Sequence, residues 1–334
     1  MKNTLLCLLI LFTVGCSQPI KPTQQTLQTI AFGSCNKEYE DQSFWPLIAA
    51  QQPDLWVWLG DNIYADTDDM VLMGNKYHQQ KTNPYYSQFI AQVPVTGIWD
   101  DHDYGINDGN KTFPMKAQAE DHFLAFMDIT EDAAVNQYPG IYRSQVFGTV
   151  PNQVKIFHLD TRYFQDPLVK TPKGSAKNYV AQPDGQVLGK EQWQWLQNEL
   201  TQSQANINII ASSIQVIAED HKYEMWANFP NERKKLLDLI VSSGANNPII
   251  LSGDRHLSEI SKINWQGQEL IDVTSSGMTH SFSGTDEYNR HRIHDLITTE
   301  SFATLAIDWS NKTLEILQIG MDGQTINAHK MNLN

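Results

Sequence analysis

The chain has 334 residues, of which 41% are hydrophobic and 19% are charged. This length and composition predict a core large enough for one domain of the larger kind, and no shift in composition marks a second globular unit. The net charge of −14 at pH 7 is the opposite of the basic face that nucleic-acid-binding proteins present, so we expect no stable binding to nucleic acid.

The N-terminal residues predict an export signal. Lys2 precedes an apolar run over residues 5–12, which is too short to cross a bilayer and is typical of a secretory signal peptide. The run leads into Thr13-Val14-Gly15-Cys16, which resembles the cleavage box of bacterial lipoproteins, and cleavage there would leave Cys16 as the acylated first residue. Ordinary secretory cleavage near this position is the alternative.

We therefore expect a lipoprotein signal peptide over residues 1–15, a flexible polar tether over 16–28 and a folded domain over 29–334. The protein would be exported and held by lipid to a bacterial membrane. In a Gram-negative bacterium, Ser17 after Cys16 favours the outer membrane, facing the periplasm or the cell surface. With Cys7 removed and Cys16 acylated, Cys35 would be the remaining thiol, so no disulfide within the chain could form. Such a thiol is either inert packing or a metal ligand.

One local pattern then repeats along the chain. Apolar runs at residues 29–32, 55–59, 95–99 and 248–251 each stop at a polar or acidic cluster. Continuous apolar runs of this length fit strands that are buried on both faces. Because ligands of layered α/β proteins bind beyond the carboxyl ends of such strands, we expect the four clusters to converge there.

Other segments predict further elements of an α/β fold. Apolar positions at helical spacing indicate helices over 190–200 and 231–241, in which Trp193 and Trp195 are better explained as core residues than as ligand platforms. Strands are predicted at 154–159, 207–217, 270–273, 303–309 and 314–319. The last two predict a hairpin with its turn near residues 310–312.

Three of the polar clusters have the residue types of a metal site. Asp61 and Tyr64 are three residues apart, and in a helical turn both side chains would project to one side, although Tyr64 alone is better explained as a half-buried aromatic. Asp100-Asp101-His102-Asp103 concentrates charge that needs a cation or raised pKa values, with a solvated acidic turn as the alternative. In an extended segment, Asp254 and His256 would share one face.

The motifs together resemble the PhoD-like alkaline phosphatases, which belong to the calcineurin-like metallophosphoesterases. The resemblance covers about residues 29 to 295 and rests on four motifs in the family's order: Phe32-Gly33-Ser34-Cys35, Gly60-Asp61-Asn62-Ile63-Tyr64, Trp99-Asp100-Asp101-His102-Asp103 and Ser252-Gly253-Asp254-Arg255-His256. It implies an α/β fold of the metallophosphoesterase type, a four-layer αββα sandwich in which two mixed sheets are flanked by helices.

The same resemblance implies a metal centre with Fe(III) and one or two Ca(II) ions. Its ligands would be Cys35 and Tyr64 for iron, Asp61 as a bridge, and Asp101, Asp254 and His256 for the rest of the centre. His102 would be the catalytic residue, and Arg255 or Arg162 would help to hold the charge of the ester. An ion pair away from the substrate is the alternative for both arginines. The isolated histidine ligand of the family is not evident near residues 212–215, and His221 is left out of the ligand set.

We therefore expect metal-dependent hydrolysis of phosphate monoesters or diesters by a metal-activated water, acting on a small phosphate ester or a phospholipid. The sequence leaves the choice of ester and the oligomeric state open. The alternatives are a non-catalytic calcium-binding surface lipoprotein and a metal-independent serine hydrolase. Thr274-Ser275-Ser276-Gly277 and nearby His280 suggest the latter, but the chain lacks the Gly-x-Ser-x-Gly elbow.

Overall fold

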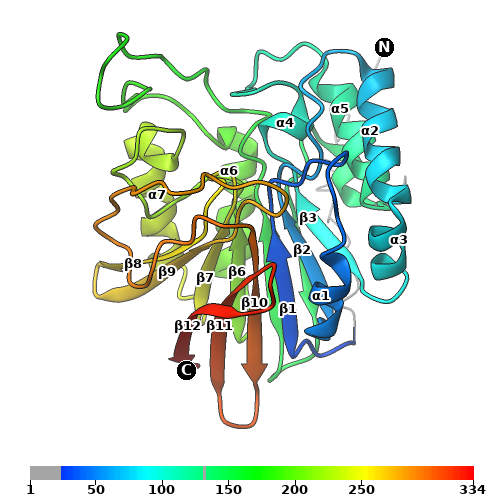
Figure 1. Cartoon of the computed structure of the whole chain (residues 1–334). Coiled ribbons are helices and arrows are strands. Elements are labelled where there is room, and N and C mark those ends of the chain that lie inside the picture. The colour runs from blue at the N-terminus through cyan, green and yellow to red at the C-terminus, as the bar shows by residue number, and fades with distance from the viewer. Residues whose placement is uncertain (1–23, 131–132) are drawn as a thin grey trace, which may run out of the picture.

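The computed structural model describes residues 24–130 and 133–334, so the predicted signal peptide, Cys16 and most of the tether lie outside the described residues. Two six-stranded sheets pack face to face, and helices cover their outer faces (Figure 1). The predicted arrangement of two mixed sheets flanked by helices is confirmed. Within the described part of the chain, no helix is both long and apolar enough to cross a bilayer.

The first sheet has the order β12-β11-β10-β1-β2-β3. Its strands are β1 (Thr29–Gly33), β2 (Leu55–Leu59), β3 (Val95–Ile98), β10 (Ser301–Asp308), β11 (Thr313–Gly320) and β12 (Thr325–Asn332). β1, β2 and β3 are parallel, whereas β10, β11 and β12 form an antiparallel meander that joins the sheet at β1. The predicted hairpin is β10–β11, and its turn spans residues 309–312.

The second sheet has the order β4-β5-β6-β7-β9-β8. Its strands are β4 (Arg143–Phe147), β5 (Val154–His158), β6 (Ile207–Ala211), β7 (Pro248–Ser252), β8 (Glu259–Trp265) and β9 (Gln268–Thr274). β5, β6, β7 and β9 are parallel, and the edge strands β4 and β8 pair antiparallel. The edge strands were not predicted. The prediction of a strand over 207–217 was wrong beyond Ala211, because the N–H groups of Val216 and Ile217 donate to the Asp272 carboxylate instead of a neighbouring strand.

The central strands bury both faces because their side chains alternate between two cores. Ile209 of β6 belongs to the core between the sheets, whereas Ile210 belongs to the core beneath two helices. These helices are α6 (Gly189–Thr201) and α7 (Pro230–Ser242). They confirm the predictions of helices over residues 190–200 and 231–241. Trp193 of α6 is only 6% exposed and lies in the same outer core, as expected of a packing residue.

Aromatic side chains attach helices to the outer face of the first sheet. Trp45 packs edge-on against Trp56 and Trp58 of β2, and its ring also contacts Phe89. The helices on this side are α1 (Trp45–Ala50), α2 (Met70–Thr82), α3 (Pro84–Ile90) and α5 (Lys116–Phe126). The short α4 (Asp101–Tyr104) follows β3 directly and lies at the end of the sheets where β1, β2 and β3 terminate (Figure 1).

Candidate metal centre

Four strand ends meet at one edge of the two sheets. Cys35 follows β1, Asp61 follows β2, Asp101 and His102 open α4 after β3, and the segment with Asp254 and His256 follows β7. The apolar runs of the sequence predict this convergence, and the structure brings the side chains together.

Glycines allow the strand ends to come this close. A Cβ atom at Gly253, after β7, would lie 2.5 Å from the carbonyl oxygen of Leu59 at the end of β2 and 2.7 Å from Ser34 Oγ. Gly60 has a φ of +96°, and a Cβ there would lie 2.5 Å from Asp100 Cβ. Both contacts are shorter than any side chain tolerates, so glycine is required where the loops cross.

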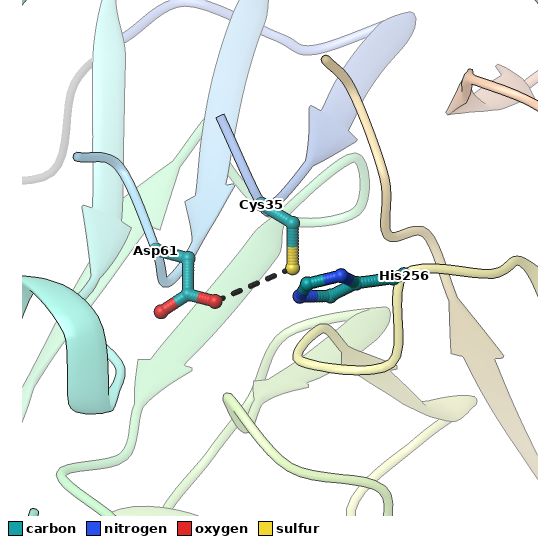
Figure 2. A group of neighbouring side chains, drawn as sticks. All are labelled: Cys35, Asp61 and His256. Carbon is teal, nitrogen blue, oxygen red and sulfur yellow. Dashed lines mark hydrogen bonds between the residues drawn. The ribbon is translucent and has the colours of Figure 1, made fainter. Parts of the chain in front are cut away.

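The first group of donor atoms comprises a thiol, a carboxylate, a phenol and an imidazole. Cys35 donates its thiol to Asp61 Oδ2 at 3.4 Å, and Tyr64 Oη donates to the same oxygen at 3.1 Å. Tyr64 Oη also lies 3.1 Å from His256 Nε2. Figure 2 shows the side chains of Cys35, Asp61 and His256 pointing toward one another, and one ligand atom from each lies within 4.8 Å of the others.

The Asp61–Tyr64 contact arises from a different backbone conformation than the sequence predicted. Residues 60–64 form bends rather than a helical turn, and Asp61 adopts a left-handed φ of 49°. This irregular backbone still directs the carboxylate and the phenol to one point.

The second group consists mainly of carboxylates. Asp101 shares a possible cation position with Asp61 and His102, and a second one with Asp100 and Asp254. The prediction that Asp254 and His256 share one face of an extended segment was wrong. Both residues have left-handed φ values, 66° and 53°, so the chain turns and directs the carboxylate to this group and the imidazole to the thiol group.

The electrostatics of both groups favour a bound cation. Burial raises the pKa of Asp61 well above its usual range, and burial followed by the charge of Asp61 does the same to the pKa of the Cys35 thiol. Burial also raises the pKa of Asp254 to about 7. Asp100 Oδ2 and His256 Nδ1 have no hydrogen-bond partner among the described residues. A cation would reverse these shifts by compensating the buried negative charge, so this donor set fits metal ions.

His102 is held on two sides. Its ring stacks on Tyr64 with a centroid distance of 4.2 Å, and its Nδ1 lies 2.7 Å from Asp66 Oδ1. Burial lowers the pKa of His102, but the charges of Asp61, Asp101 and Asp66 outweigh burial and raise this pKa to about 11. Nδ1 is therefore occupied by Asp66, and Nε2 is the nitrogen left for other partners.

Arg162 and Arg255, the two arginines expected near the ester, both form ion pairs. Arg162 is fully buried, and it donates to Asp100 at 2.5 Å and to Glu224 at 2.6 Å. Arg255 pairs with Glu287 at 2.5 Å and stacks on the ring of Tyr223. These contacts match the ion-pair alternative, and a contact of Arg255 with the ester stays a prediction.

Asp103 has a structural role. Its carboxylate accepts the backbone N–H groups of Asp61, Asn62 and Asp100, which ties the loop after β2 to the start of α4.

Several residues of the site were not predicted from the sequence. Asp108 and Glu224 complete a further cluster with Asp101, and the ring of His280 lies 4.3 Å from that of His256. Asp66, the partner of His102, was also missed. All four residues lie outside the strand-end motifs, so neither the spacing nor the apolar runs indicated them as part of a metal site. The sequence suggested His280 only for the serine hydrolase alternative. His221 is buried but belongs to none of the donor clusters of the described residues.

Comparison with known proteins finds similarity to phosphatases. The family model described as PhoD-like phosphatase matches residues 73–290, which include Asp101, His102, Asp254 and His256. Alkaline phosphatase D of Bacillus subtilis (strain 168) is 26% identical over 281 residues, which are 71% of this chain and 47% of that protein. This chain thus spans about half the length of that curated relative.

Solved structures share the fold. A structure of PhoD superimposes with a TM-score of 0.73 at 21% identity and covers 93% of this chain and 70% of the other. A purple acid phosphatase from yellow lupin (Lupinus luteus) seeds has a TM-score of 0.59 at 15% identity, covering 93% of this chain and 55% of the other. A dimetal phosphatase from Danio rerio has a TM-score of 0.57 at 11% identity, covering 92% and 99%. Because the family model matches more than half of the sequence, this chain belongs to the PhoD-like phosphatase family.

Proposed function

We propose that this chain hydrolyses phosphate esters at a metal centre formed by Cys35, Asp61, Tyr64, Asp101, Asp254 and His256. The observation that carries the proposal is the convergence of these donor atoms from the ends of four strands in a buried, electrostatically uncompensated cluster. Membership of the PhoD-like phosphatase family supports the reaction class.

The chemistry of the donors supports one choice of ions. Thiolate and phenolate ligands suit Fe(III), so Cys35 and Tyr64 would hold iron together with His256. Carboxylates suit Ca(II), so Asp101 and Asp254 would hold one or two calcium ions, and Asp61 would bridge because it lies in both groups. When bound, such ions acidify a water molecule and neutralise the charge that develops on the phosphoryl oxygens.

The residues of the chain supply orientation and proton transfer. His102 would present Nε2 to the ester, either to hydrogen-bond a phosphoryl oxygen or to protonate the leaving group, because Asp66 occupies Nδ1. The buried walls, which include Cys35 and Asp61 at 0% exposure, exclude bulk water from the inner side of the centre. The substrate would be a small phosphate ester or a phospholipid, as a monoester or a diester.

The serine hydrolase alternative gains no support from the site. Ser275 and Ser276 are fully buried, and neither hydroxyl contacts an imidazole nitrogen among the described residues. The Ser276 hydroxyl instead lies 3.0 Å from Cys35 Sγ and accepts the backbone N–H of His256 at 2.7 Å. A protein that only binds calcium would need neither Cys35 nor an oriented His102.

We further propose that the protein is exported and anchored to a membrane through acylated Cys16. The short apolar run before Gly15-Cys16 and the polar tether after it support this location.

A panel of chromogenic esters tests the proposed activity. Protein lacking residues 1–16 is loaded with iron and calcium and assayed with p-nitrophenyl phosphate, bis(p-nitrophenyl) phosphate and p-nitrophenyl acetate. The proposal expects turnover of at least one phosphate ester and none of the acetate. Hydrolysis of the acetate alone, or of no ester by protein that contains both metals, would contradict it.

A further inference from the structure

The proposed function gives no role to the long irregular connection between β5 and α6. Residues 159–188 contain no helix or strand, and their one bridge pairs Lys170 with Tyr179. In Figure 1 this connection is the green loop that extends at the upper left, at the same end of the molecule as α4. Irregular loops of this length in compact domains usually serve binding or catalysis.

The hairpin formed by residues 169–180 is basic, although the protein is strongly acidic. It contains Lys170, Lys173 and Lys177 and no acidic residue, whereas the whole chain has a net charge of −14. Lys170 and Lys173 are exposed, and among the described residues their side chains form no ion pair and no hydrogen bond. Lys177 differs, because its Nζ donates to the carbonyl oxygen of Glu219 at 2.5 Å.

The three lysines surround a cavity of about 290 Å³ within the hairpin. Thr171, Ser175 and Asn178 also line this cavity, and no carboxylate does. Ammonium, hydroxyl and amide groups are donors that bind phosphate oxygens, and unpaired lysines create a positive local potential even in a negatively charged protein.

The hairpin is attached to the candidate metal centre by two consecutive hydrogen bonds. Tyr179 Oη lies 2.8 and 2.9 Å from the two carboxylate oxygens of Asp108. The backbone N–H of Asp108 donates to Asp101 Oδ2 at 2.7 Å, and Asp101 is a candidate ligand. The backbone N–H of Asn178 also donates to the carbonyl oxygen of Lys222, which fixes the second arm of the hairpin. The basic hairpin therefore lies at the rim of the centre.

We propose that the hairpin 169–180 binds a second phosphate group of the substrate while the metal centre holds the one that is hydrolysed. The substrate class is then a phosphate ester with at least two phosphate groups, as in a short phosphodiester oligomer. This proposal rests on the proposed function, since it names the substrate class of the same site. A metal centre alone needs one phosphate. The lysines of the hairpin, which the contact between Tyr179 and Asp108 links to the centre, would give a preference for the larger anion.

A double variant tests the hairpin with little risk to folding. Lys170→Gln/Lys173→Gln removes two charges whose side chains have no partner in the described structure, and it leaves Lys177 in place. Lys312→Gln/Lys330→Gln is the matched control, because it changes the net charge equally. Lys312 lies in the β10–β11 turn and Lys330 lies on β12, and both are exposed and away from the hairpin. Lys170→Arg/Lys173→Arg keeps the charge.

The substrates are the p-nitrophenyl ester of thymidine 5′-phosphate with and without a 3′-phosphate, which differ in one phosphate group. In the wild type, the ester with the 3′-phosphate should have the lower KM, and added salt should reduce this preference. In the hairpin variant, the KM of this ester should rise about tenfold relative to the KM of the ester without the 3′-phosphate. The control and the arginine variant should keep the wild-type ratio. An unchanged ratio in the hairpin variant, or an equal shift in the control, would overturn the proposal.

Titration calorimetry with analogues of the same two compounds, in which a methylene group replaces the ester oxygen of the nitrophenyl group, gives the ratio of Kd values without release of nitrophenol. A protein that bound the 3′-phosphate through Lys170 and Lys173 but hydrolysed neither ester would contradict the proposed hydrolysis and support the hairpin. Equal Kd values for both compounds in the wild type would contradict the hairpin, whether or not the esters are hydrolysed.

Discussion

Asp66 holds His102 through a contact of 2.7 Å between Asp66 Oδ1 and His102 Nδ1. The carboxylate is itself fixed, because Oδ1 accepts the backbone N–H of Asn107 at 3.1 Å and Asp66 has a left-handed φ of 45°. A carboxylate on one ring nitrogen sets the orientation of the imidazole and favours its protonated form. In the proposed mechanism, this pair would prepare His102 Nε2 to give a proton to the leaving group.

Replacing Asp66 tests this arrangement. Asp66→Asn should lower kcat for p-nitrophenyl phosphate about 10- to 100-fold with little change in KM, because the ring loses the carboxylate that orients it and one of the three charges that raise its pKa. Bound iron and calcium, measured by elemental analysis, should stay at wild-type levels. Asp68→Asn, two residues away and exposed, is the control and should behave like the wild type. Unchanged kcat in Asp66→Asn would contradict the positioning role.

Asp101 and His102 are neighbours with different expected roles. His102→Ala should keep both metals and lose about two to four orders of magnitude in turnover, the usual scale for a general acid or base. The loss should be smaller for esters with a good leaving group. Asp101→Ala should lose calcium, whereas Asp101→Asn should retain it because the amide oxygen still coordinates. If His102→Ala removes metal as completely as Asp61→Ala, the imidazole is a ligand and the assignment is wrong.

The strand ends of the site could be predicted because a buried strand followed by an acid is a local pattern. Asp61, Asp101 and Asp254 follow this pattern, and their convergence at one edge agrees with the prediction. Asp66 and Asp108 could not be found, because their roles depend on which loops cross after folding. The turn at Asp254 and His256 was also missed, since left-handed backbone at residues other than glycine has no signature in a single sequence.

Glu120 provides a pH test of the fold away from the metal centre. It lies on α5, its Oε2 accepts the backbone N–H of Gly140 at 3.0 Å, and burial raises its pKa to about 7. The raised pKa means that the folded state binds the proton more tightly than the unfolded state. The stability from this group is thus complete below its unfolded pKa of about 4.3 and is lost as the pH rises through 7.

Glu120→Gln should remove this dependence, because the amide stays neutral and its oxygen can accept the same hydrogen bond. The Tm of the variant minus the Tm of the wild type, measured by circular dichroism, should be about 2 °C larger at pH 8 than at pH 5. Glu191→Gln, an exposed acid on α6, is the control. A difference that is equal at both pH values, or larger at pH 5, would contradict the pKa shift of Glu120.

The proposed location depends on Cys16. The full-length protein expressed in a Gram-negative host should partition with membranes, and Cys16→Ser should remain unacylated and incompletely processed. Mass spectrometry of the mature N-terminus checks the acylation directly, and Cys7→Ser is the matched control that should still be anchored. A freely soluble mature protein that starts at another residue would contradict the lipid anchor.

Removal and return of the metals tests the central claim most directly. Protein lacking residues 1–16 is stripped by exhaustive chelation, and hydrolysis of p-nitrophenyl phosphate and bis(p-nitrophenyl) phosphate is measured before stripping, after stripping, and after iron and calcium are returned together. Cys35→Ala is treated in parallel and should remain folded without regaining iron, because it loses one of several ligands. We predict that stripping abolishes hydrolysis and that the two metals restore it in the wild type but not in Cys35→Ala. Undiminished hydrolysis by protein shown to contain neither metal would contradict a metal-dependent phosphoesterase.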